Sequence, residues 1–335
     1  MPEKVAIIGG GSWGTSLAFL LSHKGFSVTL WVLEKELIPA INDTHENPLY
    51  LKGVTLSPSI QATHSMDEAV RDAAFVLFVV PSQFARGALN QLAPVLPDNL
   101  PIISATKGIE NETLLLMSQV LEEVLPSSST SRIAVLSGPS FAKEVCQRQP
   151  TAVSLASTNH SLAVELQKKL ITPYFKVFTT SDVIGVELGG ALKNVIAIAV
   201  GGADGLGFGH NTRAALISRG LAEIKRLGKA LGADPETFAG LSGLGDLVLT
   251  STGGLSRNRT VGYQIGLGRK LDDILKEMKM VAEGVETARA AYHLARKHGV
   301  RMPIVSEIFS VLFHGKDPRQ AVTHLMEREA GEEIS

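Results

Sequence analysis

Six residues near the start of the chain, Gly9–Gly14, have the sequence GGGSWG and match the pattern G-x-G-x-x-G. An apolar run typical of a buried strand precedes them, and apolar residues at helical spacing follow. In this setting Gly9 permits a tight turn, Gly11 lets the backbone approach a pyrophosphate, and Gly14 lets the helix pack closely on the strand. The free N–H groups of the helix N-terminus would then face the phosphates. The pattern favours dinucleotide binding over a merely flexible glycine turn.

The segment Trp31–Lys35 bears on which dinucleotide is bound. About 20 residues beyond such a glycine motif, an acidic side chain accepts a hydrogen bond from the adenosine ribose of NAD, whereas an arginine favours the additional phosphate of NADP. Glu34 lies in this region and no arginine does. The expected cofactor is therefore NAD or NADP, with NAD mildly favoured. Two alternatives stay open: Glu34 could be a solvated loop charge, and Lys35 could assist an added phosphate.

Lys193 is the candidate catalytic residue. It follows Gly189 and Gly190 inside a predicted helix, where each glycine costs about 1 kcal/mol relative to alanine. A helical side chain leans over the preceding turn, so Lys193 would lie over a bare glycine surface and could reach a ligand at a domain boundary. Lysine acts as a general acid or base when burial or a nearby cation lowers its pKa towards neutrality. An ordinary surface lysine is the alternative.

Two further groups of polar residues suit an anionic ligand. Lys107 follows the carboxyl end of a predicted strand, the edge at which ligands bind in open α/β sheets, and could supply a second cation. The segments Leu241–Asp246 and Gly253–Arg259 combine glycines, hydroxyls and arginine. Such a set suits a phosphate or carboxylate, because arginine offers a bidentate fork and exposed N–H groups complete it. A polar loop with solvated arginines is the alternative. His45 and His210 fit structural or surface positions better than acid–base roles.

The elements that must position these residues alternate between strand and helix in the first half of the chain. Residues 1–33 follow the order strand, glycine turn, helix, strand, and this βαβ unit is expected to have parallel strands. The predicted strands are Val5–Ile8, Ser27–Leu33, Ala74–Val80, Ile102–Ala105, Ile133–Leu136, Ala152–Leu155 and Lys176–Phe178. The predicted helices here are Ser12–His23 and Glu112–Leu125. Residues 1–180 are expected to form a Rossmann-type doubly wound α/β domain that binds NAD(P).

Helical spacing dominates the second half. The predicted helices are Asp182–Val200, Thr212–Leu231, Glu283–His298 and Pro303–Phe313, with a short one opening at Asp234–Glu236. Only Leu247–Leu249 has the composition of a strand, and the glycine-rich stretch Gly201–Gly209 would let backbones approach closely. We expect residues 181–335 to form an all-α domain for substrate binding and catalysis, packed tightly on the first domain. The charged tail Glu327–Ser335 is expected to fray.

Composition limits the class of protein. The chain has 335 residues, 44% hydrophobic and 19% charged, and its 32 Lys and Arg against 33 Asp and Glu give a net charge of −1. This balance argues against a nucleic-acid binder and a disordered chain. A single cysteine, Cys146, excludes an intramolecular disulfide, and no Cys/His cluster suggests a metal. The start lacks the features of a signal peptide and the apolar runs are too short to cross a bilayer, so we expect a cytoplasmic protein without a membrane span.

Eight motifs together give the chain a specific resemblance. They are Gly9–Thr15, Val79–Phe84, Thr106–Gly108, Ser137–Ala142, Leu192–Val195, Gly205–Thr212, Gly243–Asp246 and Ser256–Asn258. Along nearly its whole length the chain resembles the soluble NAD(P)-dependent glycerol-3-phosphate dehydrogenases. The resemblance implies reversible hydride transfer between NAD(P)H and dihydroxyacetone phosphate, giving sn-glycerol 3-phosphate for glycerophospholipid synthesis. It also implies a cytoplasmic homodimer.

The resemblance carries roles to matching positions. Lys193 would accept the proton of the substrate's C2 hydroxyl, and Lys107 would contact both substrate and cofactor. Further substrate contacts would be Gly138, Ser140, Asp246, Ser256, Arg257 and Asn258, with Arg257 also touching the cofactor. Further cofactor contacts would be Ser12, Trp13, Phe84, Ala142, Val281 and Glu283. No metal is implied.

One region departs from many bacterial relatives, which carry arginine just after the second strand. Here the sequence is Trp31–Glu34, and together with Thr44–Asn47 it looks more like the NAD-preferring relatives. Two alternatives to the implied activity remain at this point. One is a related two-domain hydroxyacid dehydrogenase that acts on a carboxylate, which fold analogy alone does not exclude. The other is a dinucleotide-sensing binding protein that lacks turnover.

Overall fold

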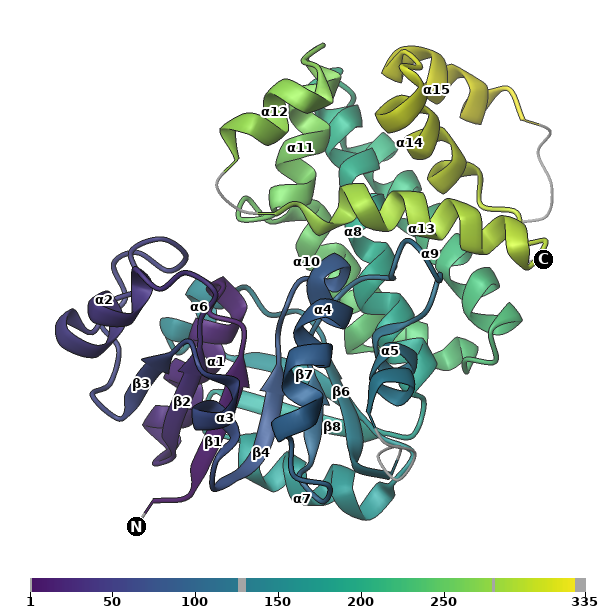
Figure 1. Cartoon of the computed structure of the whole chain (residues 1–335). Helices are drawn as coiled ribbons and strands as arrows, with labels where there is room; N and C mark the ends of the chain where they lie inside the picture. Colours follow the sequence, from purple (N-terminus) through teal and green to yellow (C-terminus); the bar gives the residue numbers. More distant parts are fainter. Residues whose placement is uncertain (1, 126–130, 279–280, 329–335) are drawn as a thin grey trace.

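The computed structural model describes residues 2–125, 131–278 and 281–328. In this part of the chain, eight strands form one sheet in the order β3-β2-β1-β4-β5-β6-β7-β8 (Figure 1). The strands are β1 Lys4–Ile8, β2 Ser27–Trp31, β3 Ile60–Thr63, β4 Ala73–Phe78, β5 Ile102–Ser104, β6 Ile133–Ser137, β7 Thr151–Ala156 and β8 Phe175–Thr180. Neighbouring strands are parallel except β6 and β7, which are antiparallel.

The sheet is buried on both faces because its strands are apolar at successive positions. In β1, Val5 and Ile7 join the core on one face, whereas Ala6 and Ile8 join the core on the other, as the alternation of side chains along a strand requires. The helices of this half are α1 Ser12–Lys24, α2 Leu37–Thr44, α3 Met66–Val70, α4 Ser82–Leu92, α5 Met117–Val124, α6 Ala142–Cys146 and α7 His160–Leu170. Residues of α1 and α7 pack in the first core and residues of α3, α4 and α5 in the second. The predicted doubly wound α/β fold is confirmed.

The strand order reverses between β1 and β4. The segments that follow these two strands therefore leave the sheet in different directions and open a crevice at its carboxyl edge, where open α/β sheets bind ligands. Gly9 follows β1 and Val79 follows β4 at this point, and α1 begins directly after the glycine turn. The fold thus places the glycine motif at the position that a dinucleotide requires.

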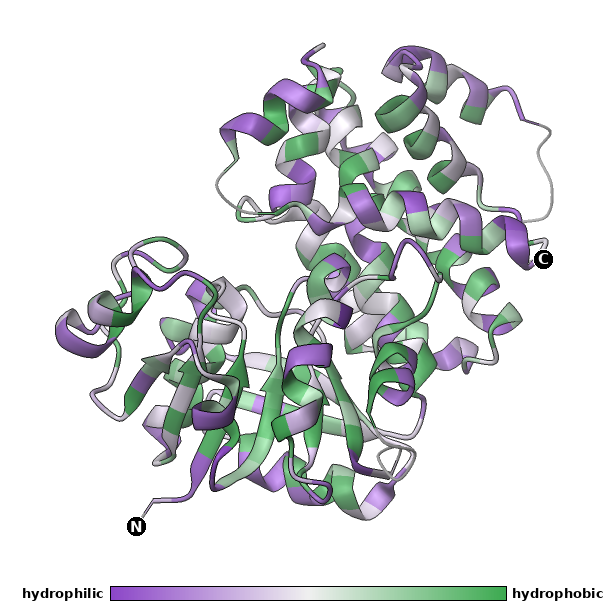
Figure 2. Ribbon diagram, viewed as in Figure 1, coloured by the Kyte–Doolittle hydropathy of each residue, from purple (hydrophilic) through white to green (hydrophobic). Residues whose placement is uncertain are grey.

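The second half of the chain is helical around one central helix, α8 Val183–Gly205. The helices around it are α9 His210–Ala230, α10 Asp246–Thr252, α11 Arg257–Gly266, α12 Leu271–Glu277, α13 Glu283–Lys297, α14 Pro303–His314 and α15 Pro318–Met326. Among the described residues, α8 alone is long and apolar enough to cross a membrane, yet 89% of its apolar stretch is buried inside the protein. It is the core helix of this domain. Outer helices such as α12 and α15 carry many hydrophilic residues (Figure 2).

Helices α8 and α11 approach unusually closely because both carry glycines four residues apart. Gly201 and Gly205 lie on α8, and Gly262 and Gly266 lie on α11. A Cβ atom at any of the four would fall well inside the contact distance of a backbone oxygen on the opposite helix. The expectation that backbones meet closely in the glycine-rich stretch is confirmed for these two positions of α8. The contact fixes where the N-terminus of α11 lies relative to α8.

Several predicted elements were wrong in type or extent. The strand-like run Leu247–Leu249 lies in α10, where Leu247 is buried and Val248 is 40% exposed, as on an amphipathic helix. The helix predicted from Glu112 begins only at Met117, because Leu114 has a left-handed φ of 63° and the chain turns there. Strand β3 and several short helices were not predicted. Most of the tail expected to fray lies outside the described residues.

Candidate active site

Two lysines and an aspartate meet where the two domains face each other. Lys193, in the middle of α8, is 7% exposed, and its Nζ donates to Asp246 Oδ1 and, at 2.8 Å, to Thr250 Oγ1. Asp246 is fully buried at the start of α10. Its Oδ2 accepts from Lys107 Nζ at 2.7 Å. Lys107 also donates to the Gly138 carbonyl oxygen at 3.1 Å, so one carboxylate holds a lysine from each domain.

Burial lowers the pKa of Lys193 to about 7. Loss of hydration is the largest cause, the positive charge of Lys107 adds to it, and the negative charge of Asp246 opposes it. Near neutral pH both the ammonium and the amine forms are therefore populated. A group with such a pKa can give or take a proton at physiological pH, so the centre is suited to acid–base chemistry.

The reason for the two glycines before Lys193 differs from the one predicted. Gly189 does not leave a bare surface: a Cβ there would collide with the Ser242 carbonyl oxygen. A Cβ at Gly190 would collide with Ser137 Oγ. The glycines thus admit the end of β6 and the single π-helical turn Leu241–Gly245, which leads directly into Asp246. The two glycines therefore let these segments pack closely around Lys193. Lys193 is buried, so the alternative of an ordinary surface lysine is wrong.

Gly138 and Ser140 form the wall beside Lys107. Gly138 follows β6 with a φ of 146°, and a Cβ there would lie 2.8 Å from Val153 Cα, so only glycine fits. Its carbonyl oxygen accepts from Ser140 Oγ at 3.1 Å as well as from Lys107. The half-buried Ser140 thus lies against the same carbonyl as the lysine.

The start of α11 is linked to Lys193 through its neighbour Asn194. Asn258 Nδ2 donates to Asn194 Oδ1 at 2.9 Å, and Asn258 Oδ1 accepts from the Gly284 N–H at 2.9 Å. Ser256 caps the helix by accepting from the Arg259 N–H at 3.2 Å. Arg257 is exposed, with Nη1 donating to the Val281 carbonyl oxygen at 3.0 Å. An exposed guanidinium at a capped helix N-terminus suits an anion.

Glu283, the first residue of α13, faces the same space. Burial raises the pKa of its carboxyl, while the positive charges of Arg257, Lys107 and Lys193 oppose the rise. The Ser82 backbone N–H also bonds to it. This carboxylate therefore lies within electrostatic range of all three cations of the site.

The glycine turn fits a pyrophosphate. Gly9 has a φ of 119°, and a Cβ there would lie 2.7 Å from the Val79 carbonyl oxygen. A Cβ at Gly14 would collide with the Gly9 carbonyl oxygen, whereas one at Gly11 would meet no atom within 4 Å. The space at Gly11 is thus open to a ligand. Trp13 Nε1 is buried and has no hydrogen-bond partner in the described chain, so it is a donor that a bound dinucleotide could satisfy.

The remaining predicted cofactor residues lie around this crevice. Phe84, near the start of α4, is 62% exposed, and Val281 is 46% exposed. Ala142 begins α6, and its carbonyl oxygen accepts from Ser16 Oγ of α1 at 3.0 Å. Glu34 follows β2, on the opposite side of β1 from Lys107, which follows β5. Glu34 and Lys107 therefore lie on opposite sides of the point where the strand order reverses. This placement fits an extended dinucleotide that contacts both.

Three residues of this region make contacts that the sequence did not indicate. Thr250 accepts from Lys193, Asn47 Nδ2 donates to the Gly10 carbonyl oxygen at 2.9 Å, and Tyr50 Oη donates to Glu34 Oε1 at 2.5 Å. Each contact joins residues at least 16 positions apart, so no local pattern indicates it. Because of Tyr50, Glu34 is not a freely solvated loop charge.

The two histidines lie apart from the lysines. His210 is exposed at the start of α9, where its Nδ1 lies 3.3 Å from Arg213 Nη1, and His45 ends α2 with a φ of 54°. In the described ranges no cluster of three His, Cys, Asp or Glu could hold a metal ion. Burial raises the pKa of the Cys146 thiol to about 11. None of these groups offers an alternative catalytic centre.

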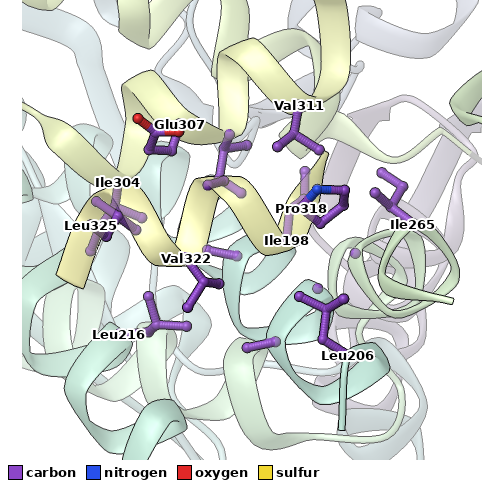
Figure 3. A pocket seen from close by; sticks show the side chains of 16 residues that line it. Ile198, Leu206, Leu216, Ile265, Ile304, Glu307, Val311, Pro318, Val322 and Leu325 are labelled. Atoms are coloured by element: carbon purple, nitrogen blue, oxygen red, sulfur yellow. The ribbon is translucent and has the colours of Figure 1, made fainter. Parts of the chain in front are cut away.

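A separate cavity lies between α8, α9, α11, α14 and α15 and is lined mainly by apolar side chains (Figure 3). Its volume is about 50 Å³, and Glu307 is the single carboxylate in its wall. Glu307 already bonds to Lys316 at 2.5 Å and to His324 at 2.5 Å. A space this small, with its one acid already paired, fits a packing gap of the helical core better than a reaction site.

Comparisons with known proteins agree with this geometry. The model of the NAD-dependent glycerol-3-phosphate dehydrogenase N-terminus matches residues 4–163, and that of the C-terminus matches residues 182–323. The chain is 55% identical over 329 residues to glycerol-3-phosphate dehydrogenase [NAD(P)+] of Geobacter sulfurreducens, covering 98% of each. It is 51% identical over 330 residues to the protein of that name from Myxococcus xanthus, again covering 98% of each.

Solved structures give the same answer. Glycerol-3-phosphate dehydrogenase from Coxiella burnetii superposes with a TM-score of 0.93 at 37% identity, covering 98% of this chain and 99% of that one. D-mandelate dehydrogenase in complex with NADH gives a TM-score of 0.62 at 14% identity, covering 94% of this chain and 99% of that one. The second likeness shows a shared fold alone, and the first is accompanied by sequence identity along the whole chain. The chain belongs to the NAD-dependent glycerol-3-phosphate dehydrogenase family.

Proposed function

We propose that this protein is an NAD(P)-dependent oxidoreductase that interconverts dihydroxyacetone phosphate and sn-glycerol 3-phosphate. The observation that carries the proposal is the buried Lys193, whose pKa is about 7 and which is paired with Asp246 beside the sheet crevice. The relatives that match the full chain bear the name of this activity. The small-molecule substrate and the cofactor would meet between the two domains.

Lys193 is the proposed proton carrier. When bound, NAD(P)H supplies the hydride that reduces C2 of the substrate. In that direction the Lys193 ammonium donates a proton to the C2 oxygen, and in the reverse direction the amine accepts it. Asp246 and Thr250 hold Lys193 Nζ in place, while Lys107 offers a second positive charge to the developing oxyanion.

The phosphate of the substrate is proposed to bind at the start of α11. Arg257 offers a bidentate fork, and Ser256 and Asn258 lie beside it at a helix N-terminus. Lys107, Gly138, Ser140 and Asp246 would line the rest of the substrate. Binding the remote phosphate orients C2 relative to Lys193, which lowers the entropic part of the barrier.

The dinucleotide is proposed to lie along the carboxyl edge of the sheet. Its contacts would be Gly9, Gly11, Ser12, Trp13, Gly14, Glu34, Phe84, Lys107, Ala142, Arg257, Val281 and Glu283. The open space at Gly11 and the unpartnered Trp13 Nε1 support the pyrophosphate position. Glu34 favours NAD over NADP, because a carboxylate accepts from a ribose hydroxyl and repels an added phosphate.

The domain boundary would fall at residues 180/181, since β8 ends at Thr180 and α8 begins at Val183. The chain would work as a homodimer in the cytoplasm. Its product would supply glycerophospholipid synthesis. Family membership supports the homodimer, the location and the role in lipid synthesis, and the burial of α8 supports the absence of a membrane span.

The test is the absorbance of NADH, and separately of NADPH, after dihydroxyacetone phosphate is added to the purified protein. We expect rapid loss of absorbance, and its near abolition in Lys193→Ala with NADH binding almost intact. Lys229→Ala, which changes an exposed lysine of α9, is the matched control and should retain wild-type turnover. Near wild-type turnover in Lys193→Ala would remove Lys193 from this role. No turnover in folded wild-type protein would overturn the proposed activity, and carboxylate substrates would be tested next.

A further inference from the structure

Tyr50 contacts two parts of the proposed cofactor site, both on its adenosine side. Its backbone carbonyl oxygen accepts from Ser12 Oγ, on the glycine turn, at 2.6 Å. Its phenol donates to Glu34 Oε1, beyond β2, at 2.5 Å. One half-buried residue thus touches both the region that would hold the pyrophosphate and the carboxylate that would hold the ribose.

Tyr50 is itself held by a fully buried asparagine. Its N–H donates to Asn47 Oδ1 at 3.1 Å. Asn47 Nδ2 donates to the Gly10 carbonyl oxygen and to Thr15 Oγ1, both at 2.9 Å. The segment Asn47–Tyr50 is therefore tied to the glycine turn at several points, so the phenol has a defined position from which to hold Glu34.

The phenol remains a donor throughout the physiological range. Burial, followed by the hydrogen bond and negative charge of Glu34, raises the pKa of Tyr50 to about 12. One oxygen of Glu34 is occupied by Tyr50, which fixes the orientation of the carboxylate and leaves Oε2 to accept from a ribose hydroxyl. A phosphate on that ribose would instead meet a negative charge that Tyr50 keeps from moving aside.

We propose that Tyr50 is a positioning residue that holds Glu34 against the adenosine ribose and thereby makes NADH the preferred cofactor over NADPH. This inference rests on the proposed function, because it assumes that the dinucleotide lies along this edge. Glu34 alone would already discriminate between NADH and NADPH, and Tyr50 is a second residue that contributes to this discrimination. The role is indirect, so its signature is a change in the ratio of two affinities rather than in the chemical step.

The first variant is Tyr50→Phe, which removes the hydroxyl and keeps the ring. Dissociation constants for NADH and NADPH are measured by fluorescence titration, alongside kcat and KM with dihydroxyacetone phosphate. We expect about a 5- to 10-fold loss of NADH affinity, the size of one ordinary hydrogen bond because the role of Tyr50 is indirect, and less than about a 2-fold change for NADPH. The value of kcat should stay unchanged. Tyr263→Phe, at a 40% exposed tyrosine of α11, is the matched control.

A double-mutant cycle tests whether Tyr50 acts through Glu34. In the Glu34→Ala background, Tyr50→Phe should leave the NADH-to-NADPH affinity ratio unchanged, because the group that Tyr50 positions is gone. A ratio that falls equally in both backgrounds would show a direct contact and overturn the inference. So would an unchanged ratio in Tyr50→Phe, or a wild-type protein that binds NADPH more tightly. If Tyr50→Phe lowers the melting temperature, the single variant Glu34→Ala provides the test. It must then lower the NADH-to-NADPH affinity ratio relative to the wild type.

The titrations keep this inference separate from the proposed activity. Protein that binds NADH but does not turn over dihydroxyacetone phosphate would contradict the proposed function and leave the affinity ratio measurable. Turnover with an affinity ratio insensitive to Tyr50 would contradict the inference and leave the function standing.

Discussion

Lys107 and Asp246 form an ion pair across the boundary between the sheet domain and the helical domain, with Lys107 Nζ 2.7 Å from Asp246 Oδ2. The second oxygen of the same carboxylate binds Lys193. Lys107 follows β5 and Lys193 lies in α8, so the arrangement exists only when both domains are folded and docked. Asp246 is 0% exposed, and two positive charges on one buried carboxylate leave the centre with a net positive charge when Lys193 is protonated.

The first prediction concerns Asp246→Asn. Removing the carboxylate removes the interaction that keeps the pKa of Lys193 from falling further, and it removes the group to which both lysines are hydrogen-bonded. We expect kcat/KM for dihydroxyacetone phosphate at pH 7 to fall by about 100-fold or more, as when an electrostatic component of a catalytic site is removed. Steady-state kinetics together with the melting temperature separate this loss from unfolding. A folded variant within about threefold of wild-type activity would contradict the role given to Asp246.

The second prediction is a pair of opposite pH profiles. Lys193 has a pKa of about 7 in the folded protein, so the ammonium form is lost as the pH rises through this value. Reduction of dihydroxyacetone phosphate needs the ammonium, and its kcat/KM should fall above about pH 7. Oxidation of glycerol 3-phosphate needs the amine, and its kcat/KM should fall below about pH 7. Measuring both directions in one buffer series tests the assignment, and profiles with the same sign would contradict it.

Strong local patterns predicted the sheet domain well. The apolar run Val5–Ile8 and the glycine motif after it have their signals in neighbouring residues, and the strand and turn there were predicted correctly. Elements set by distant contacts were not predicted. Leu247–Leu249 has β-branched and aliphatic residues typical of a strand, yet the turn Leu241–Gly245 against α8 places it in a helix. Where the local preference for strand or helix is weak, packing against distant segments determines the secondary structure.

The residues of the candidate site could be selected from the sequence by their type, but their arrangement could not. Lys193 stood out because two glycines precede it in a helix, although the glycines admit neighbouring segments and do not leave a bare surface. Thr250 and Tyr50 had no signal, because a lone hydroxyl in a sequence does not reveal its partner. Their contacts, with Lys193 and Glu34, appear only when α8, α10 and the segment after β2 are placed in space.

The third prediction uses Glu187, a buried carboxylate of α8 that bonds to the Ser118 N–H at 2.8 Å and to Ser118 Oγ at 2.5 Å. Burial raises the pKa of Glu187 from 4.5 to about 7, so the folded state holds a proton between these values that the unfolded state does not. Its contribution to the free energy of unfolding therefore falls as the pH rises from about 4.5 to about 7 and is constant above. The wild type should lose on the order of 3 kcal/mol relative to Glu187→Gln over that interval.

Urea unfolding of both proteins at pH 5 and pH 8 measures this difference. Glu165→Gln changes an exposed glutamate of α7 and should leave the pH dependence as in the wild type. If the difference between wild type and Glu187→Gln does not change with pH, Glu187 does not hold the proton. If the wild type instead gains stability relative to Glu187→Gln as the pH rises, the direction of the pKa shift is wrong.

The last prediction contrasts two glycine-to-alanine substitutions in helices. In an exposed helix, alanine is preferred over glycine by about 1 kcal/mol. Gly87 of α4 is exposed, and a Cβ there would meet nothing within 4 Å, so Gly87→Ala should raise the melting temperature by roughly 2–4 °C. Gly262 of α11 faces the Ile198 carbonyl oxygen of α8, and a Cβ there would collide with it. Forcing the helices apart costs about 1–3 kcal/mol or more, which exceeds the gain in helix preference.

Gly262→Ala should therefore lower the melting temperature by several degrees, on the order of 2–4 °C per kcal/mol. It should also lower kcat/KM, because α11 carries Arg257 and Asn258 and a displaced helix moves both away from Lys193 and Asn194. Scanning fluorimetry and steady-state kinetics on the two variants side by side give the test. A melting temperature at or above that of the wild type in Gly262→Ala would mean that the contact between α8 and α11 can relax, so these glycines would not fix the position of Arg257 and Asn258.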